Sequence, residues 1–271
     1  MAFLAVCRDN PLWPACHGLC RRIELRAVPP FPPCPDPAGN HSADFLVERV
    51  LFRDAMMLVI DKPAGMPVHA GPGGGSNLEQ FFEALRFGLP RLPALAHRLD
   101  RDTSGCLILG RHRKALARLG RLFAAGKIEK TYWAVVQGGP PDDRGRIDLA
   151  LQKVARKDGW RMYADPSGQS AITDYRLLGQ GGGLSFLEFH PRTGRTHQIR
   201  VHAAAIGCPI LGDRIYGPPD SADPLHLHSR GITIPLYPAR EAIAVTAPPP
   251  PQMLAALNAC GWGVSATASS A

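Results

Sequence analysis

The sequence predicts an α+β domain in which helices flank a central mixed or antiparallel β-sheet. Several short apolar runs are each bounded by a turn signal, and a few segments between them have helical spacing. Strands and helices do not alternate regularly, as they would in a parallel sheet. At 271 residues and 29.2 kDa, the chain is long enough to bury a substantial core as one domain.

We expect this domain to cover residues 44–258, between an irregular leader (1–43) and a flexible tail (259–271). In the leader, Ala27–Pro37 is rich in proline, which has no backbone N–H and continues neither a helix nor a strand ladder. The tail consists mostly of small and polar residues, which bury too little apolar surface to become ordered.

The apolar runs predict the strands of the sheet. The first two are continuous in their apolar character, which indicates strands buried on both faces, and the other three have β-prone compositions. The five runs are Met57–Ile60, Cys106–Leu109, Tyr132–Val136, Leu184–Phe189 and Ile243–Thr246.

Three segments carry apolar residues at helical spacing. Ser76-Asn-Leu-Glu79 is a capping-box pattern at the start of the first, and Gly207 is expected at the C′ position of the last. The apolar positions are Leu78, Phe81, Phe82 and Leu85; Leu116, Leu119, Leu122 and Phe123; and Ile199, His202, Ala203 and Ile206.

The overall charge favours a polyanionic partner. The chain has 31 Lys and Arg against 23 Asp and Glu, a net charge of +8, and a pI of about 9.4. No apolar run approaches the roughly 18–20 residues that span a bilayer. Met1–Cys7 lacks the basic stretch and the length of a signal peptide, so we expect a cytoplasmic protein.

Cysteine usage indicates reduced thiols rather than disulfides or a metal site. Four of the seven cysteines, Cys7, Cys16, Cys20 and Cys34, lie in the leader, with His17 among them. A zinc site there is conceivable, but no Cys-x2-Cys pair is present. We therefore expect no metal.

A polar stretch, His97–Gly105, directly precedes a predicted strand. Arg98 and Arg101 flank Asp100 and would keep its carboxylate ionised, ready to act as a nucleophile or base. The same residues also fit a turn in which Asp100 or Asp102 only accepts backbone hydrogen bonds.

Two further polar clusters interrupt the apolar pattern. Lys130-Thr-Tyr132 begins a predicted strand, where the tyrosine is suited to core packing or to catalysis. His190–Arg200 is a basic turn that leads into a helix. There Arg192, Arg195 and the free N–H groups of the helix form either a phosphate site or a solvated basic loop.

Arg200 follows the apolar Ile199 and therefore lies beside the buried face of that helix. A partly buried arginine requires a carboxylate partner, and Asp100 is the natural candidate.

Four stretches, which occur along the chain in the order found in the family, resemble the motifs of the RluA family of pseudouridine synthases. His97-Arg-Leu-Asp-x-x-Thr-Ser-Gly105 resembles the family's signature. Leu58–Gly65 is similar to its early strand and turn, Lys130–Tyr132 to its Lys-x-Tyr segment, and Gly194–His202 with Gly207–Gly217 to its third block. The resemblance covers about residues 45–258.

The resemblance implies an enzyme that converts a uridine within RNA to pseudouridine without metal or cofactor. Asp100 matches the essential aspartate, either as a nucleophile at the sugar or as a base. Tyr132 matches the tyrosine that stacks on the target base and can assist proton removal. Arg200 matches the basic partner of the aspartate, and Ile199 an apolar wall of the pocket. Arg98 matches an arginine that helps to extrude the uridine.

Extruding a uridine from a stem or loop costs roughly a few kcal/mol, which such contacts would offset. Arg101, Arg192, Arg195 and His197 are the expected contacts to the rest of the RNA. The leader is too short and irregular for the S4 RNA-binding module of many family members. The resemblance then favours a minimal catalytic domain that finds its RNA, a stem-loop of ribosomal or transfer RNA, through the catalytic face itself. By default we expect a monomer without an obligatory protein partner.

Two other classes remain to be weighed. A domain that binds RNA without chemistry would lack Asp100, Tyr132 or Arg200, and all three are present. A metal-dependent hydrolase or deaminase is suggested by ten His and seven Cys, but the zinc-deaminase pattern is absent. Insensitivity of the activity to a strong chelator would separate the two enzyme classes.

Overall fold

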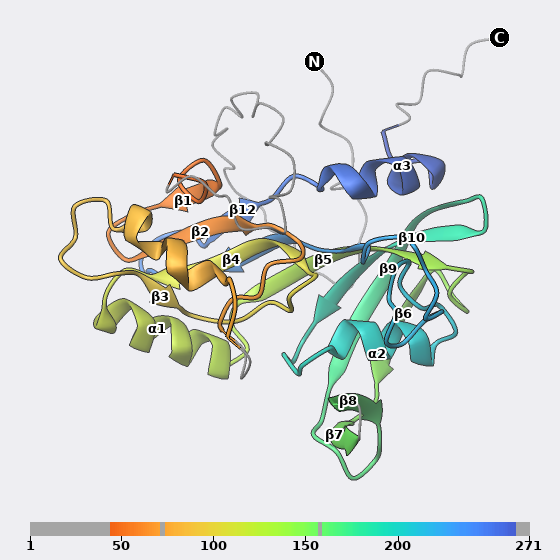
Figure 1. The fold of residues 1–271 in the computed structure, drawn as a ribbon. Coiled ribbons are helices and arrows are strands. Elements are labelled where there is room, and N and C mark those ends of the chain that lie inside the picture. The colour runs from red at the N-terminus through yellow and green to blue at the C-terminus, as the bar shows by residue number, and fades with distance from the viewer. Residues whose placement is uncertain (1–43, 71–73, 157–158, 264–271) are drawn as a thin grey trace. The chain divides into compact units, whose positions relative to one another are not determined.

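The computed structural model describes residues 44–70, 74–156 and 159–263 (Figure 1). The leader with its four cysteines lies outside these residues. The elements, in chain order, are β1 (Val50–Arg53), β2 (Met57–Lys62), the 3-10 helix η1 (Leu78–Leu85), β3 (Ala94–Leu95), β4 (Ser104–Gly110), α1 (Arg113–Ala124), β5 (Glu129–Gln137), β6 (Arg144–Asp148), β7 (Leu151–Arg156), β8 (Gly159–Ala164), β9 (Ile172–Gly181), β10 (Leu184–Pro191), α2 (Gln198–Ala205), β11 (Leu227–Ile234), β12 (Ile243–Thr246) and α3 (Pro251–Ala259).

The main sheet is mixed, which confirms the predicted fold class. Its strand order is β1-β2-β4-β11-β5-β10-β9-β6, with β12 beside β11 and β3 beside β4. β11 runs parallel to β4, whereas the other neighbours are antiparallel. β7 and β8 form a separate two-stranded sheet (Figure 1).

Successive strand residues alternate between two cores on opposite faces of the sheet, as the period of two requires. Leu58 and Ile60 of β2 share one core with η1 and α2. Met57 and Val59 face the other side, where they pack against α1. In β5 the same alternation brings Val135 against α3.

The parallel contact between β4 and β11 depends on a glycine. Gly105 has φ +103°, and a Cβ at this position would lie 2.3 Å from the backbone oxygen of Ser229. Only glycine allows the two backbones to approach this closely, and it holds the loop before β4 next to β11.

The five predicted strands are present as β2, β4, β5, β10 and β12, and the second and third predicted helices are α1 and α2. Gly207 follows α2 with φ +79°, as expected of C′. The first helix differs from its prediction because it is a 3-10 helix. Its N-cap is Asn77, whose side chain accepts the backbone N–H of Glu79. The capping box therefore joins Asn77 with Gln80 instead of Ser76 with Glu79.

The sequence did not indicate β6–β9, β11 or α3. The strands β6–β9 are rich in polar residues, and α3 begins directly after a run of prolines. α3 continues to Ala259, and beyond it Cys260 is buried and Trp262 packs on Trp133 at 6.1 Å. Ordered packing therefore extends into the first residues of the predicted tail.

No helix in the described ranges is long and apolar enough to cross a membrane.

Candidate active site

A cavity of about 440 Å³ lies where the loop before β4, the start of β5 and the segment from the end of β10 into α2 meet. Seven of the predicted site residues line it: Arg98, Asp100, Tyr132, Arg195, His197, Ile199 and Arg200. Arg101 and Arg192 do not. Stretches that are about a hundred residues apart in sequence thus converge on one site.

Lys62 holds the loop that carries Asp100. Its side chain is fully buried, and its ammonium donates hydrogen bonds to the backbone oxygens of Pro63, Met66 and Arg101 at 2.6, 2.9 and 2.8 Å. The guanidinium of Arg101 in turn donates to the backbone oxygen of Gly65 at 3.0 Å. The early strand-and-turn motif is therefore a support for the Asp100 loop.

His97 anchors the start of the same loop as a neutral residue. Its Nε2 accepts the backbone N–H of Ile108 at 3.0 Å, and its ring lies 4.9 Å from that of Phe123. Burial lowers the pKa of His97 to about 3, so the ring carries its single proton on Nδ1 at neutral pH.

Arg200 does not pair with Asp100, as the sequence had suggested, but with Asp213. Nε and Nη2 of Arg200 donate to the two carboxylate oxygens of Asp213, both at 2.7 Å, and the Asp213 side chain is fully buried. Asp213 also accepts the backbone N–H groups of Ile215 and Tyr216. Asp100, with 29% of its side chain exposed, is not part of this buried pair, because the Arg200 guanidinium is bonded to Asp213 instead.

Asp100 nevertheless acts on Arg200 at longer range. Burial by itself lowers the pKa of Arg200, but Asp213 and then Asp100 raise it above its ordinary value. Burial likewise raises the pKa of Asp213, and the stronger effect of Arg200 holds it below its usual range. The pair is therefore fully ionised beside the cavity.

His197 lies between the cavity and the tyrosine of the third motif. Its Nδ1 is 2.8 Å from the hydroxyl of Tyr216, and its Nε2 is 4.0 Å from a carboxylate oxygen of Asp100. Its backbone has φ +54°, in the left-handed region that is unusual for a residue other than glycine. Burial lowers the pKa of His197 and so favours the neutral ring, although Asp100 has the opposite effect.

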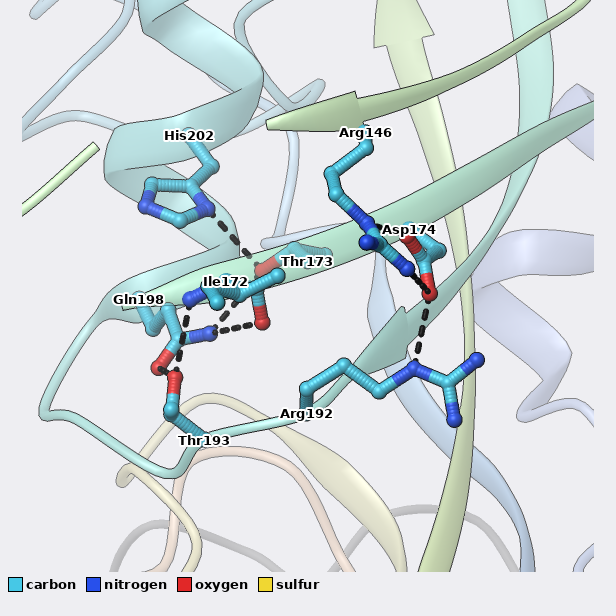
Figure 2. A network of polar contacts seen from close by, with 8 residues as sticks. All are labelled: Arg146, Ile172, Thr173, Asp174, Arg192, Thr193, Gln198 and His202. Carbon is cyan, nitrogen blue, oxygen red and sulfur yellow. Dashed lines mark hydrogen bonds and ion pairs between the residues drawn. The ribbon is translucent and has the colours of Figure 1, made fainter. Parts of the chain in front are cut away.

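Gln198 fixes the start of α2 to β9 (Figure 2). Its amide nitrogen donates to the backbone oxygen of Ile172 and the hydroxyl of Thr173, at 3.0 and 2.9 Å. Its amide oxygen accepts from the hydroxyl of Thr193 and the backbone N–H of Arg195, at 2.7 and 2.9 Å. All four hydrogen-bonding positions of this buried amide are used, so the helix that carries Ile199 and Arg200 has a defined orientation.

His202 adds a further connection between α2 and the strands. Its Nε2 donates to the backbone oxygen of Leu149 at 3.1 Å, so its Nδ1 accepts the hydroxyl of Thr173 at 2.9 Å (Figure 2). This residue is fully buried and serves packing. In the portion of the chain that the structure covers, no three His, Cys, Asp or Glu side chains form a metal-holding group.

The basic residues predicted to contact phosphate have intramolecular partners. Arg192 donates to Asp174 at 2.7 Å, and Asp174 also accepts from Arg146 (Figure 2). Arg195 donates from Nε to the backbone oxygen of Ser170 at 3.1 Å. Of the predicted phosphate-contacting arginines Arg192 and Arg195, the second is the one that reaches the cavity.

Lys130 and Tyr132 enter the cavity from the start of β5. The ammonium of Lys130 donates to the backbone oxygen of Thr193 at 3.0 Å, and burial lowers the pKa of Lys130 to about 8. Burial raises the pKa of Tyr132 above its ordinary value, so its phenol is neutral at physiological pH. The sequence drew attention to Lys130 only as part of a motif and not as a residue of the site.

Comparison with known proteins identifies the family of this chain. Residues 56–205 match the RNA pseudouridylate synthase family. An uncharacterized RNA pseudouridine synthase of Zymomonas mobilis is 46% identical over 193 residues, which cover 70% of this chain and 88% of that protein. Ribosomal large subunit pseudouridine synthase C of Buchnera aphidicola is 38% identical over 203 residues, which cover 71% of this chain and 64% of that protein.

A solved structure shares the fold. Human RNA pseudouridylate synthase domain containing 4 has a TM-score of 0.68 and 25% identity over 81% of this chain and 95% of its own. The chain therefore belongs to the RNA pseudouridylate synthases, the RluA-type isomerases whose motifs it carries.

Proposed function

We propose that this enzyme isomerises specific uridines of ribosomal or transfer RNA to pseudouridine, with Asp100 as its catalytic carboxylate. The observation that carries this proposal is the state of that carboxylate. Within the described ranges it accepts no hydrogen bond, and its nearest ion-pair partner is Nε2 of His197 at 4.0 Å. Because the Arg200 fork is bonded to Asp213, Asp100 remains available to the substrate.

The reaction requires that the uridine leave its helical stack. Arg98 is exposed at the cavity, where it can occupy the space that the flipped nucleotide vacates. Ile199 and Leu227 supply apolar walls. These walls hold the detached base and exclude water that would otherwise trap the sugar.

The chemistry itself is balanced without a co-reactant. The C1′–N1 bond breaks, the base rotates, and C5 bonds to C1′; C5 then gives up its proton and N1 gains one. Asp100 acts at the sugar as nucleophile or base. Tyr132 is neutral, so it contacts the base by stacking and hydrogen bonding and not as a phenolate.

The ionised Arg200–Asp213 pair would support Asp100 without bonding to it. The Arg200 guanidinium favours the anionic form of a nearby carboxylate, while the two hydrogen bonds to Asp213 keep the arginine in place. Asp100 and Arg200 therefore interact electrostatically, without a hydrogen bond between them.

For the substrate we favour large-subunit ribosomal RNA. The net charge of +8 suits a structured RNA, and one relative bears the name of a large-subunit ribosomal enzyme. We further propose that the enzyme is a cytoplasmic monomer that needs no metal, cofactor or protein partner. Activity that survives a strong chelator, together with a single-chain mass in solution, would support this.

The test compares two carboxamide variants of one loop. Wild-type protein, Asp100→Asn and Asp102→Asn are incubated with unmodified large-subunit ribosomal and transfer RNA transcripts, and pseudouridine is mapped by carbodiimide adducts and primer extension. Asp100→Asn should form no product while still binding RNA. Asp102, whose side chain is 55% exposed, should tolerate the change.

Equal activity of the two variants would exclude a catalytic role for Asp100. If neither the wild-type protein nor a strain that expresses it forms pseudouridine, the proposed activity is wrong.

A further inference from the structure

The β7–β8 hairpin extends past α2, apart from the main sheet (Figure 1). A two-stranded ribbon is marginal by itself, and this one is held by its base. Met162 and Leu151 pack against Val201 of α2, and the backbone N–H of Met162 donates to the hydroxyl of Tyr216 at 3.1 Å. The hairpin is thus fixed to the same tyrosine that contacts His197.

The strand register defines an inner face of the hairpin. Lys153 lies opposite Met162, and Ala155 lies opposite Trp160, so these four side chains share one face. Met162 is buried toward α2, which makes this the face directed at the site.

Trp160 continues the site from the cavity outward. Its ring stacks on that of His197 at 5.3 Å and 27°, and His197 lines the cavity beside Asp100. The ammonium of Lys153 lies 4.3 Å from the centre of the same indole. Despite these two contacts, 42% of Trp160 is exposed. A large aromatic surface is therefore left open at the edge of the site.

The chemistry of the hairpin fits single-stranded RNA. Its inner face carries one basic and one aromatic side chain, Lys153 and Trp160, whereas Arg161 and Tyr163 lie on the outer face. Neither Leu151–Arg156 nor Gly159–Ala164 contains an Asp or Glu. A basic group beside an aromatic ring is typical of surfaces that stack bases and neutralise phosphates. A nucleotide flipped into the cavity leaves its neighbours unstacked at the opening.

We propose that the inner face of this hairpin binds the nucleotide adjacent to the target uridine. The base of that nucleotide stacks on Trp160, and Lys153, which now lies over the indole, moves to its phosphate. The hairpin then helps to select the sequence or shape that flanks the modified position. This inference rests on the proposed function and assigns it a second RNA contact.

The first test measures binding without turnover. In an Asp100→Asn background, affinity for a fluorescein-labelled oligouridylate is followed by fluorescence anisotropy for Trp160→Ala, Trp160→Phe and Lys153→Gln. Loss of one stacked base should weaken binding about fivefold to a hundredfold for Trp160→Ala, and less for Trp160→Phe. Lys153→Gln should reduce the slope of log affinity against log salt by about one.

Two controls separate the inner face from general effects. Val154 is 37% exposed on the outer face of the same hairpin, and Arg144 is an exposed basic residue on the edge strand β6. Val154→Ala and Arg144→Gln should leave the affinity nearly unchanged. Melting temperatures are measured for every variant. If Trp160→Ala unfolds, the affinities of Trp160→Phe and Lys153→Gln test the inference instead.

Each outcome has a definite meaning. Equal binding by the Trp160 and Val154 variants overturns the inference, and so does failure of the parent protein to bind the oligonucleotide. The proposed function is tested separately by isomerisation of ribosomal RNA transcripts. An active wild-type enzyme with unaltered Trp160 variants refutes the hairpin contact alone, whereas RNA binding through Trp160 without isomerisation refutes the activity alone.

Discussion

Arg200 donates two hydrogen bonds of 2.7 Å to Asp213 and is thereby held beside, but not bonded to, Asp100. The side chains of Arg200 and Asp213 are 7% and 0% exposed, respectively. A pair that is this deeply buried is costly to break, because the remaining charge loses its partner without regaining water. The structural role falls to Asp213, and the Asp100 carboxylate accepts no hydrogen bond in the described part of the chain.

This arrangement predicts unequal stability effects for substitutions of Asp213 and Asp100. Asp213→Ala should lower the free energy of unfolding by about 3–5 kcal/mol, because it leaves the Arg200 guanidinium buried and unpaired. Asp100→Asn should change stability little, because Asp100 is partly exposed and bonded to no side chain in the described ranges. Urea unfolding followed by circular dichroism measures both. A loss of similar size in Asp100→Asn would mean that Arg200 depends on Asp100 as well.

Gly105 predicts a contrast between two glycine substitutions. Gly105→Ala places a Cβ 2.3 Å from the Ser229 oxygen at a φ of +103°, so β4 and β11 must separate. We expect a loss of at least about 2 kcal/mol in unfolding free energy and a larger loss of activity, since the Asp100 loop moves with β4.

The matched control lies in α1. Gly120 has an ordinary helical backbone, is exposed and would have no atom within 4 Å of an added Cβ. Gly120→Ala should therefore stabilise the protein by up to about 1 kcal/mol. If Gly105→Ala is tolerated as well as this control, the close approach of the two strands does not constrain the site.

Asp61 predicts a pH dependence of stability. Burial raises the pKa of this carboxyl to about 6, against opposing effects of Arg49 and Lys62, from 3.8 in an unfolded chain. Between these two values the folded state binds more protons than the unfolded state. The contribution of Asp61 to stability is therefore complete below about pH 4 and is lost as the pH rises through about 6.

The expected size follows from the shift, at about 1.4 kcal/mol per unit and thus at most about 3 kcal/mol. Urea unfolding of the wild-type protein and Asp61→Asn at several values between pH 4 and pH 7 gives the difference in slope. The wild-type protein should lose unfolding free energy relative to Asp61→Asn as the pH rises. Parallel curves for the two proteins would show that folding does not raise the pKa of Asp61.

The sequence by itself determined the mixed α+β class, the strands with strong apolar runs, and the family. Through the resemblance of its motifs to the RluA family, it also predicted that Asp100, Tyr132, Ile199 and Arg200 belong to one site, and all four line the cavity. Strong local patterns of this kind need no knowledge of neighbouring elements.

The tertiary structure decided which groups pair and which remain available. Asp213 and Asp100 are both acidic residues near Arg200, and only burial and distance distinguish the partner from the candidate catalyst. The polar strands β7 and β8 have no apolar run, so the stacking of Trp160 on His197 was not visible in the sequence. Contacts between residues far apart in the chain depend on how the sheet closes, and a linear pattern contains little information about that.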